Sequence, residues 1–213
     1  MNIWRARLER WFRPLAVRCP LSPNTISTLA LFITLGAAVI MSRGARIPWM
    51  FLLAPPLIAV GGLLDAFDGI VARVQNRTSR LGDFLDHVFD RIVDVGLLAG
   101  WCVGARIRPD LALFTLACVT LFGYLGTQIE ATFGVRTYEG TGRGEYVIAL
   151  VVLPMIGYIN ATTSLSVLRL GALSLPECAT MLLTVATVLA LVQRFRLALR
   201  LARSMEDEGE SKE

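Results

Sequence analysis

Four aspartates with fixed spacing lie in sequence that is otherwise apolar enough to cross a bilayer. The pairs Asp65/Asp68 and Asp86/Asp90 are spaced i,i+3 and i,i+4, so each pair falls on one face of a helix. Carboxylates at membrane depth are costly, and they mark ion sites, substrate sites or proton paths. Four converging acidic groups repel one another unless a cation lies between them. The pattern therefore predicts a membrane enzyme built around a metal cluster.

The type of ligand indicates which metal would bind. All candidate ligands are hard oxygens, which favours Mg²⁺ or Mn²⁺ over zinc and leaves calcium as an alternative. Four carboxylates exceed what one Mg²⁺ usually collects, so we expect two ions, which suit a diphosphate substrate because they neutralise its pyrophosphate oxygens. The missing side chains of Gly69 and Gly82 let a phosphate or ribose approach the helix backbone, and Arg73 offers a further cation.

The same residues form a recognisable motif. Residues 65–90 read D-x-x-D-G-x-x-A-R, eight residues, then G-x-x-x-D-x-x-x-D. This resembles the signature of the CDP-alcohol phosphatidyltransferase family, with every fixed position filled. The resemblance implies a transferase that displaces CMP from a CDP-linked alcohol and joins the phosphorylated alcohol to a second hydroxyl. It also implies that Asp65, Asp68 and Asp86 are the main metal ligands, and that Asp90 is the base and touches the second metal.

Contacts to the donor nucleotide are expected in two segments. By resemblance, the motif region places them at Gly69, Arg73 and Ser79, beside the open backbone at Gly82. A shorter resemblance precedes the first span and adds Asn24, Thr25 and Ser27. That stretch fits an ordinary helix cap equally well, with Ser22 or Asn24 as the capping residue.

A glycine-rich stretch at 133–145 carries the candidate acceptor residues Arg136 and Arg143. Two arginines there can bind an anionic acceptor such as a sugar phosphate or glycerol phosphate, although a flexible positively charged linker explains them equally well. Family members that use inositol phosphate carry basic residues near 126–128, where this chain has Gly, Thr and Gln, which argues against that acceptor. Glycerol phosphate, inositol phosphate, serine and a neutral polyol stay open.

Composition sets the fold class. The chain has 213 residues, of which 54% are hydrophobic and 18% charged, and a mean hydropathy of +0.59, so a membrane protein is favoured. Residues 1–22 place Trp4 and Trp11 among arginines, a pattern typical of an amphipathic helix lying on an anionic surface. We therefore expect an all-α, polytopic fold with this N-terminal interfacial helix and six transmembrane helices. Their ranges are approximately 25–42, 48–72, 82–105, 110–133, 145–160 and 176–198.

The distribution of arginine predicts the orientation in the membrane. Six spans return both termini to one side, and fourteen arginines fall on that side against five in the opposite loops. The positive-inside rule then places the termini and the aspartate loop in the cytoplasm. We expect one membrane domain over 1–203 and an acidic, disordered tail over 204–213.

Other functions and partners follow from the same features. A divalent-cation transporter could use the same carboxylates, but the acids cluster at one membrane face and do not continue across. Scattered cysteines carry no zinc or redox motif. The expected partners are a CDP-linked lipid donor, CDP-diacylglycerol or its ether-lipid counterpart, a small polar acceptor, the lipid bilayer of the cell membrane and a second copy of the chain, with no nucleic acid. The predicted role is phospholipid biosynthesis.

Overall fold

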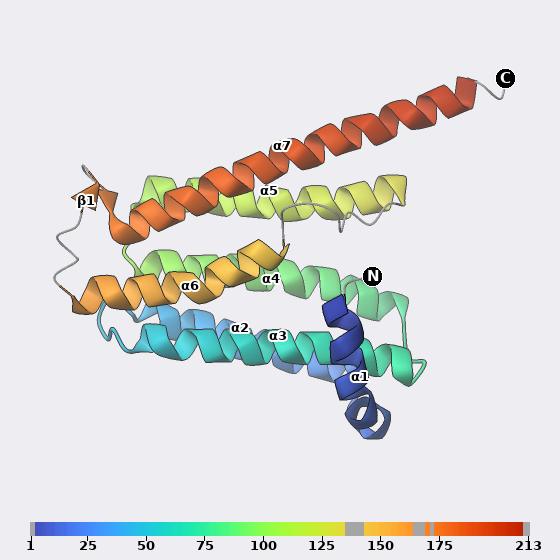
Figure 1. The fold of residues 1–213 in the computed structure, drawn as a ribbon, viewed down its shortest axis with the longest axis horizontal. Coiled ribbons are helices and arrows are strands. Elements are labelled where there is room, and N and C mark those ends of the chain that lie inside the picture. Colours follow the sequence, from blue (N-terminus) through green and yellow to red (C-terminus); the bar gives the residue numbers. More distant parts are fainter. Residues whose placement is uncertain (1–2, 135–142, 164–168, 171–172, 211–213) are drawn as a thin grey trace.

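The computed structural model describes residues 3–134, 143–163, 169–170 and 173–210. Within these ranges the chain forms seven helices and one short hairpin, in which β1 pairs antiparallel with β2 (Figure 1). The elements are α1 (Ile3–Arg18), α2 (Pro23–Ser42), α3 (Met50–Val74), α4 (Arg80–Gly104), α5 (Pro109–Phe133), α6 (Arg143–Thr162), β1 (Arg169–Leu170), β2 (Leu173–Ser174) and α7 (Leu175–Glu210).

Each of the six apolar segments predicted from the sequence forms one helix, which confirms the all-α class. Four of these helices, α2, α3, α5 and α7, are long and apolar enough to cross a membrane. Helix α4 is less apolar because its first half holds the charged residues of the motif, and α6 contributes a shorter apolar stretch, Val151–Thr162. The chain is therefore a multi-pass membrane protein, and six spans stay a prediction.

Helices α2 to α7 run roughly along one another, and α1 crosses α3 near the end where α4 begins (Figure 1). Helix α2 packs on both α3 and α4, while α5 packs on α7. Glycines permit the closest approach: a Cβ on Gly104 of α4 would stand 2.0 Å from the carbonyl oxygen of Met41 on α2. Such small residues let membrane helices pack backbone to backbone, so the position of α4 against α2 is tightly set.

The apolar core lies at the end of the bundle away from α1. Trp101 and Phe51 are fully buried there with their rings 6.1 Å apart. The Trp101 indole Nε1 donates a hydrogen bond of 2.9 Å to Thr180 Oγ1 on α7, which satisfies a polar group that would otherwise be buried unpaired. This core joins α4 to α7 at the end of the bundle opposite to the motif aspartates.

Helix α1 is amphipathic in the structure. Phe12 contacts Phe67 of α3 at a ring separation of 5.7 Å, and Ala16 is fully buried. The opposite face leaves Trp11 84% and Leu15 65% exposed. One face of α1 is thus docked on the bundle, and the other presents large apolar side chains next to the arginines of the segment.

The C-terminal segment differs from the sequence expectation. Disorder was expected from Ser204, but α7 continues as helix to Glu210. Adding residues to an established helix costs little, and Met and Glu favour it, so an acidic composition does not by itself end the helix. Residues 211–213 lie outside the described part of the chain.

Candidate functional site

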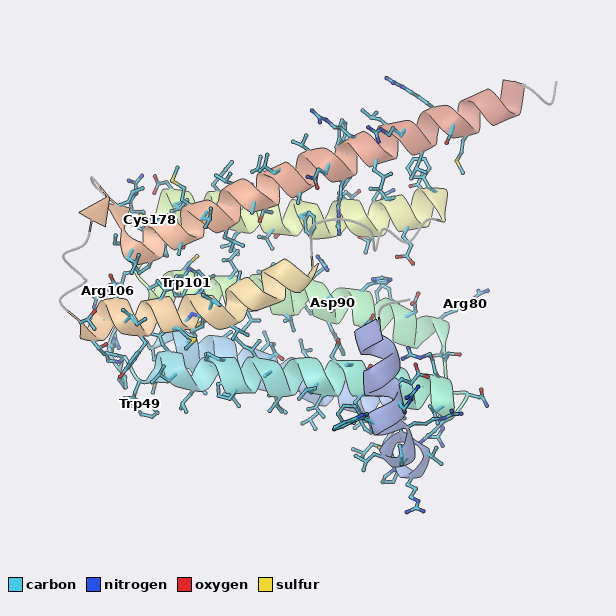
Figure 2. The ribbon with its side chains drawn as sticks, viewed as in Figure 1. Trp49, Arg80, Asp90, Trp101, Arg106 and Cys178 are labelled. Atoms are coloured by element: carbon cyan, nitrogen blue, oxygen red, sulfur yellow. The ribbon has the colours of Figure 1, made fainter. Side chains whose placement is uncertain are left out.

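Three of the four motif aspartates converge. Asp65 comes from the C-terminal half of α3, and Asp86 and Asp90 come from the N-terminal half of α4. One carboxylate oxygen from each lies within 4.8 Å of the other two. Asp90 lies on α4 between Arg80 at its start and Trp101 in the core, in the region that α1 crosses (Figure 2). Negative charges this close favour a cation between them.

The fourth aspartate, Asp68, is only 7% exposed. Its carboxyl group lies close to Ser27 of α2 and to Asp86 and Asp90 of α4. Its Oδ2 atom is buried, and none of the described residues supplies it with a hydrogen-bond partner. A buried carboxylate oxygen without a partner is costly, and a bound cation would satisfy it. The residues present, all carboxylates, therefore fit Mg²⁺ or Mn²⁺.

Two helix N-termini meet next to the carboxylates. Ser79 caps α4, its Oγ accepting a hydrogen bond of 3.0 Å from the Gly82 backbone N–H. A Cβ on Gly82 would stand 3.2 Å from Ser79 Oγ and 3.4 Å from Asn24 Oδ1. Ser22, rather than Asn24, caps α2, since its Oγ accepts from the Thr25 N–H. Asn24 is thus turned toward α4, and the structure brings Asn24, Ser79 and Gly82 together.

The remaining candidate donor residues lie on either side of this point. A Cβ on Gly69 would stand 3.5 Å from Arg73 Nη1, so the guanidinium lies over the glycine. Arg73 Nη2 is also 4.0 Å from Glu9 Oε2 of α1, in an exposed pair. Ser27 donates to the Pro23 carbonyl and lies beside Asp68, so it faces the carboxylates, whereas Thr25 shares a hydrogen bond with Ser22.

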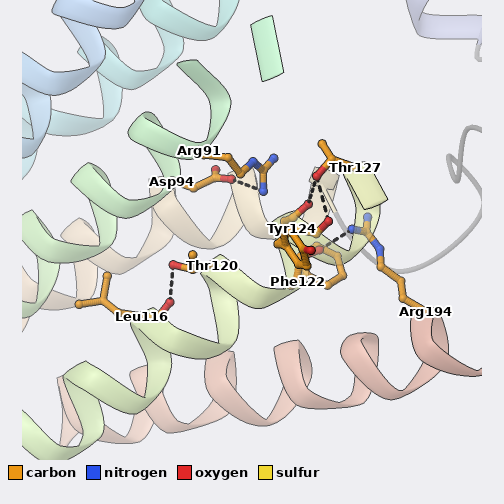
Figure 3. Close-up of polar contacts among 9 residues, drawn as sticks. Arg91, Asp94, Leu116, Thr120, Phe122, Tyr124, Thr127 and Arg194 are labelled. Atoms are coloured by element: carbon orange, nitrogen blue, oxygen red, sulfur yellow. Dashed lines mark hydrogen bonds and ion pairs between the residues drawn. The ribbon is translucent and has the colours of Figure 1, made fainter. Parts of the chain in front are cut away.

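The predicted acceptor residues are less defined. Arg136 lies outside the described residues, and the side chain of Arg143, the first residue of α6, does so too. The described part of the chain shows two other arginines that sequence reasoning did not assign to the site. Arg91 of α4 pairs with Asp94 at 3.1 Å, and Arg194 of α7 donates to the Phe122 carbonyl at 2.7 Å (Figure 3).

Helix α5 accommodates both arginines with glycine. A Cβ on Gly123 would collide with the Arg91 guanidinium, and a Cβ on Gly126 would stand 2.3 Å from Arg194 Nη1. The Arg194 guanidinium also lies 3.7 Å from the centre of the Phe122 ring, a cation–π contact. The i,i+3 pair of glycines in α5 is the sequence signal that could have indicated large side chains from neighbouring helices at this level.

Comparison with known proteins identifies the family. The family model for CDP-alcohol phosphatidyltransferase matches residues 20–204, and the chain belongs to that family. The archaetidylinositol phosphate synthase of Pyrococcus horikoshii is 31% identical over 154 residues, 72% of this chain and 79% of the relative.

Solved structures share the fold. A crystal structure of Mycobacterium tuberculosis phosphatidylinositol phosphate synthase with manganese and citrate superposes with a TM-score of 0.65 at 21% identity, covering 92% of this chain and 88% of that one. The same protein with CDP-DAG bound gives 0.64 at 21% identity, covering 91% and 92%. At this identity the likeness shows the fold.

Membership of the family establishes the reaction class. The chain is an enzyme of phospholipid biosynthesis that transfers a substituted phosphoryl group from a CDP-linked lipid to a hydroxyl of an alcohol acceptor and releases CMP. The family is metal-dependent. Membership of this transferase family replaces the divalent-cation transporter that the sequence had left as an alternative.

Proposed function

We propose that the reaction takes place at the cluster of Asp65, Asp68, Asp86 and Asp90, with Mg²⁺ or Mn²⁺ as the cofactor and two ions as the expected number. The observation that carries this proposal is the convergence of three carboxylate oxygens within 4.8 Å, beside the buried Asp68 Oδ2, which has no hydrogen-bond partner among the described residues. Divalent ions bound there would neutralise charge on the donor diphosphate and on the departing CMP.

The four aspartates have different proposed roles in the reaction. Asp65, Asp68 and Asp86 would hold the metal. Asp90, which would also touch the second ion, accepts the proton of the acceptor hydroxyl. The acceptor oxygen then forms a bond to the phosphorus that carries the lipid alcohol, and the phosphoanhydride bond to CMP breaks. The four aspartates come from two helices that both pack on α2, so the base and the ligands stay in fixed relation to one another.

The donor nucleotide is assigned to the meeting point of α2 and α4. Gly82 leaves the backbone open, and the polar atoms of Asn24 and Ser79 face the same point. Gly69 and Arg73 of α3 are proposed to bind the phosphates of the donor, with the Arg73 guanidinium making a charge-assisted contact. Two more α2 residues, Thr25 and Ser27, complete the proposed donor set, with Ser27 on the side of the carboxylates.

The acceptor is proposed to be a small polar molecule that enters from the cytoplasmic side, with Arg136 and Arg143 as its contacts if it carries a phosphate. The Pyrococcus relative is named for inositol phosphate. The Gly126-Thr127-Gln128 stretch of this chain departs from the basic pattern of members that use that acceptor. The proposed acceptor class is therefore a polyol or a polyol phosphate, and experiment decides its identity.

The membrane arrangement belongs to the same proposal. We infer six spans, with both termini and the active site in the cytoplasm, and α1 lying in the interface with Trp11 and Leu15 toward the lipid. The domain is proposed to span residues 1–203, and the acidic segment 204–213 to take no part in it. A homodimer in the cell membrane also stays a prediction.

The proposal is tested with purified full-length protein and a matrix of substrates. CDP-diacylglycerol and its ether-lipid counterpart are each incubated with Mg²⁺ or Mn²⁺ and glycerol phosphate, inositol phosphate, serine or inositol. CMP release and the product lipid mass are measured together. We expect one donor–acceptor pair to give both signals, and CMP release from none of the pairs with either metal would contradict the proposal.

A further inference from the structure

Gln75 connects two stretches of chain that lie far apart in the sequence. Its side-chain Nε2 donates to the Ala16 carbonyl at 2.8 Å and to the Cys19 carbonyl at 2.9 Å. Ala16 belongs to the last turn of α1, and its carbonyl also accepts a hydrogen bond of 3.3 Å from the Cys19 backbone N–H. One amide at the end of α3 therefore uses both of its hydrogens to close the end of α1.

The surroundings hold Gln75 in this place. Gln75 is the C-cap residue of α3, and its backbone N–H donates to the Val71 carbonyl at 2.9 Å. Asn76 then takes a left-handed conformation, with φ of 54°, and turns the chain toward α4. Ala16 and Val71 are fully buried in an apolar cluster with Ile26 and Ile70. The contact is thus made between two well-packed helix ends.

Two short connections, one from α1 to α2 and one from α3 to α4, lead from this contact to the proposed donor site. From Cys19 the chain runs to Ser22, which caps α2, and then to Asn24. From Gln75 it runs to Ser79, which caps α4. The two connections come together at Gly82, which both Asn24 Oδ1 and Ser79 Oγ face. The hydrogen bonds of Gln75 therefore join the two connections at one end, and the proposed donor residues lie at the other end.

We propose that Gln75 is a positioning residue that sets Asn24 against Gly82 and Ser79 and thereby controls use of the CDP-linked donor. This inference rests on the proposed function, in which those three residues receive the donor nucleotide. Without the two hydrogen bonds, the connection from α1 to α2 loses its attachment to the loop between α3 and α4. The carboxylates should be less affected, because they lie on α3 and α4, which pack on α2, whereas Asn24 lies in the first turn of α2, directly after the connection that Gln75 holds.

The test compares two variants that remove the donor hydrogens. Gln75→Leu keeps a similar size, and Gln75→Glu keeps the shape but directs a carboxylate at two carbonyl oxygens. Each should raise the KM for the CDP-linked donor about five- to thirtyfold while kcat and the acceptor KM change less than about twofold. Gln193→Leu, the same change at an exposed position of α7, is the control and should leave all constants unaltered.

A purely structural role would give a different result. It would lower the melting temperature and kcat without a selective change in donor KM. Gln75→Leu is therefore repeated in an Asn24→Ala background, where the proposal expects no further increase in donor KM because the effect passes through Asn24. Gln75→Met, which keeps the unbranched stem, replaces leucine if that variant does not purify.

The possible outcomes distinguish failure of the Gln75 positioning role from failure of the proposed function. No CMP release by the wild-type enzyme would contradict the proposed function. An active wild type together with an unchanged donor KM in the Gln75 variants would overturn the positioning role alone, as would full additivity with Asn24→Ala.

Discussion

Asn24 of α2 and Gly82 of α4 lie in direct opposition, with the Asn24 Oδ1 atom 3.4 Å from the point where a Cβ on Gly82 would stand. The pair joins the first turn of α2 to the glycine that precedes the acidic pair of α4. Neither residue belongs to the carboxylate cluster, and both belong to the proposed donor site.

This contact makes Gly82→Ala the most informative test of the donor site. The added methyl group would fill the space faced by Asn24 and Ser79 and crowd the nucleotide, so we expect donor KM to rise about tenfold with little change in melting temperature. Gly62→Ala in α3 is the matched control, since a Cβ there meets nothing within 4 Å. Equal KM values for both variants would remove Gly82 from the donor site.

Asp90→Asn separates chemistry from donor binding. The amide cannot accept the proton of the acceptor hydroxyl, so kcat should fall by roughly 10²- to 10⁴-fold, the usual contribution of a general base. Donor affinity, measured by titration in Mg²⁺, should stay within a few fold, because Asp65, Asp68 and Asp86 remain to hold the metal. Near-normal turnover would place the base elsewhere.

Arg143→Ala tests the proposed acceptor side. If the acceptor carries a phosphate, the variant loses a contact of ~1.5–3 kcal/mol that is present in both ground and transition states. Acceptor KM should then rise roughly ten- to hundredfold while donor KM is unchanged. Arg46→Ala, an exposed arginine between α2 and α3, is the control. An unaltered acceptor KM would identify the 133–145 stretch as a charged linker and favour a neutral polyol.

The six-span arrangement is tested by cysteine labelling. All four native cysteines are free, so a cysteine-free background is made first. Single cysteines at Arg77 and Ser204 should react with a membrane-impermeant reagent from the cytoplasmic side, and one at Arg46 from the opposite side. Labelling of Arg77 and Ser204 from different sides would refute the model.

Hydropathy and spacing predicted the helices well for physical reasons. Apolar runs of about 20 residues have little alternative to helix in a bilayer, since every backbone polar group must be paired within the segment. The i,i+4 spacing likewise predicted that Asp86 and Asp90 lie on one face of α4, because helix geometry sets which side chains share a face.

Contacts between helices could not be derived in this way. The Gln75 hydrogen bonds to Ala16 and Cys19 depend on how α1 docks, and no local periodicity encodes that docking. The choice between Ser22 and Asn24 as the cap of α2 was equally open, since both side chains can accept a backbone hydrogen bond. The structure decides for Ser22.

The central claim, that the aspartate cluster binds the metal used in transfer, is tested most directly by CMP release from a CDP-linked lipid under metal depletion. Activity should vanish in EDTA and return with Mg²⁺ or Mn²⁺ in the wild-type enzyme. Asp65→Asn and Asp86→Asn should not recover with either metal, although both should purify as folded membrane proteins, while Asp83→Asn, outside the cluster, should recover fully. Full turnover in EDTA, or recovery of the Asp86→Asn enzyme to the wild-type rate, would contradict the account.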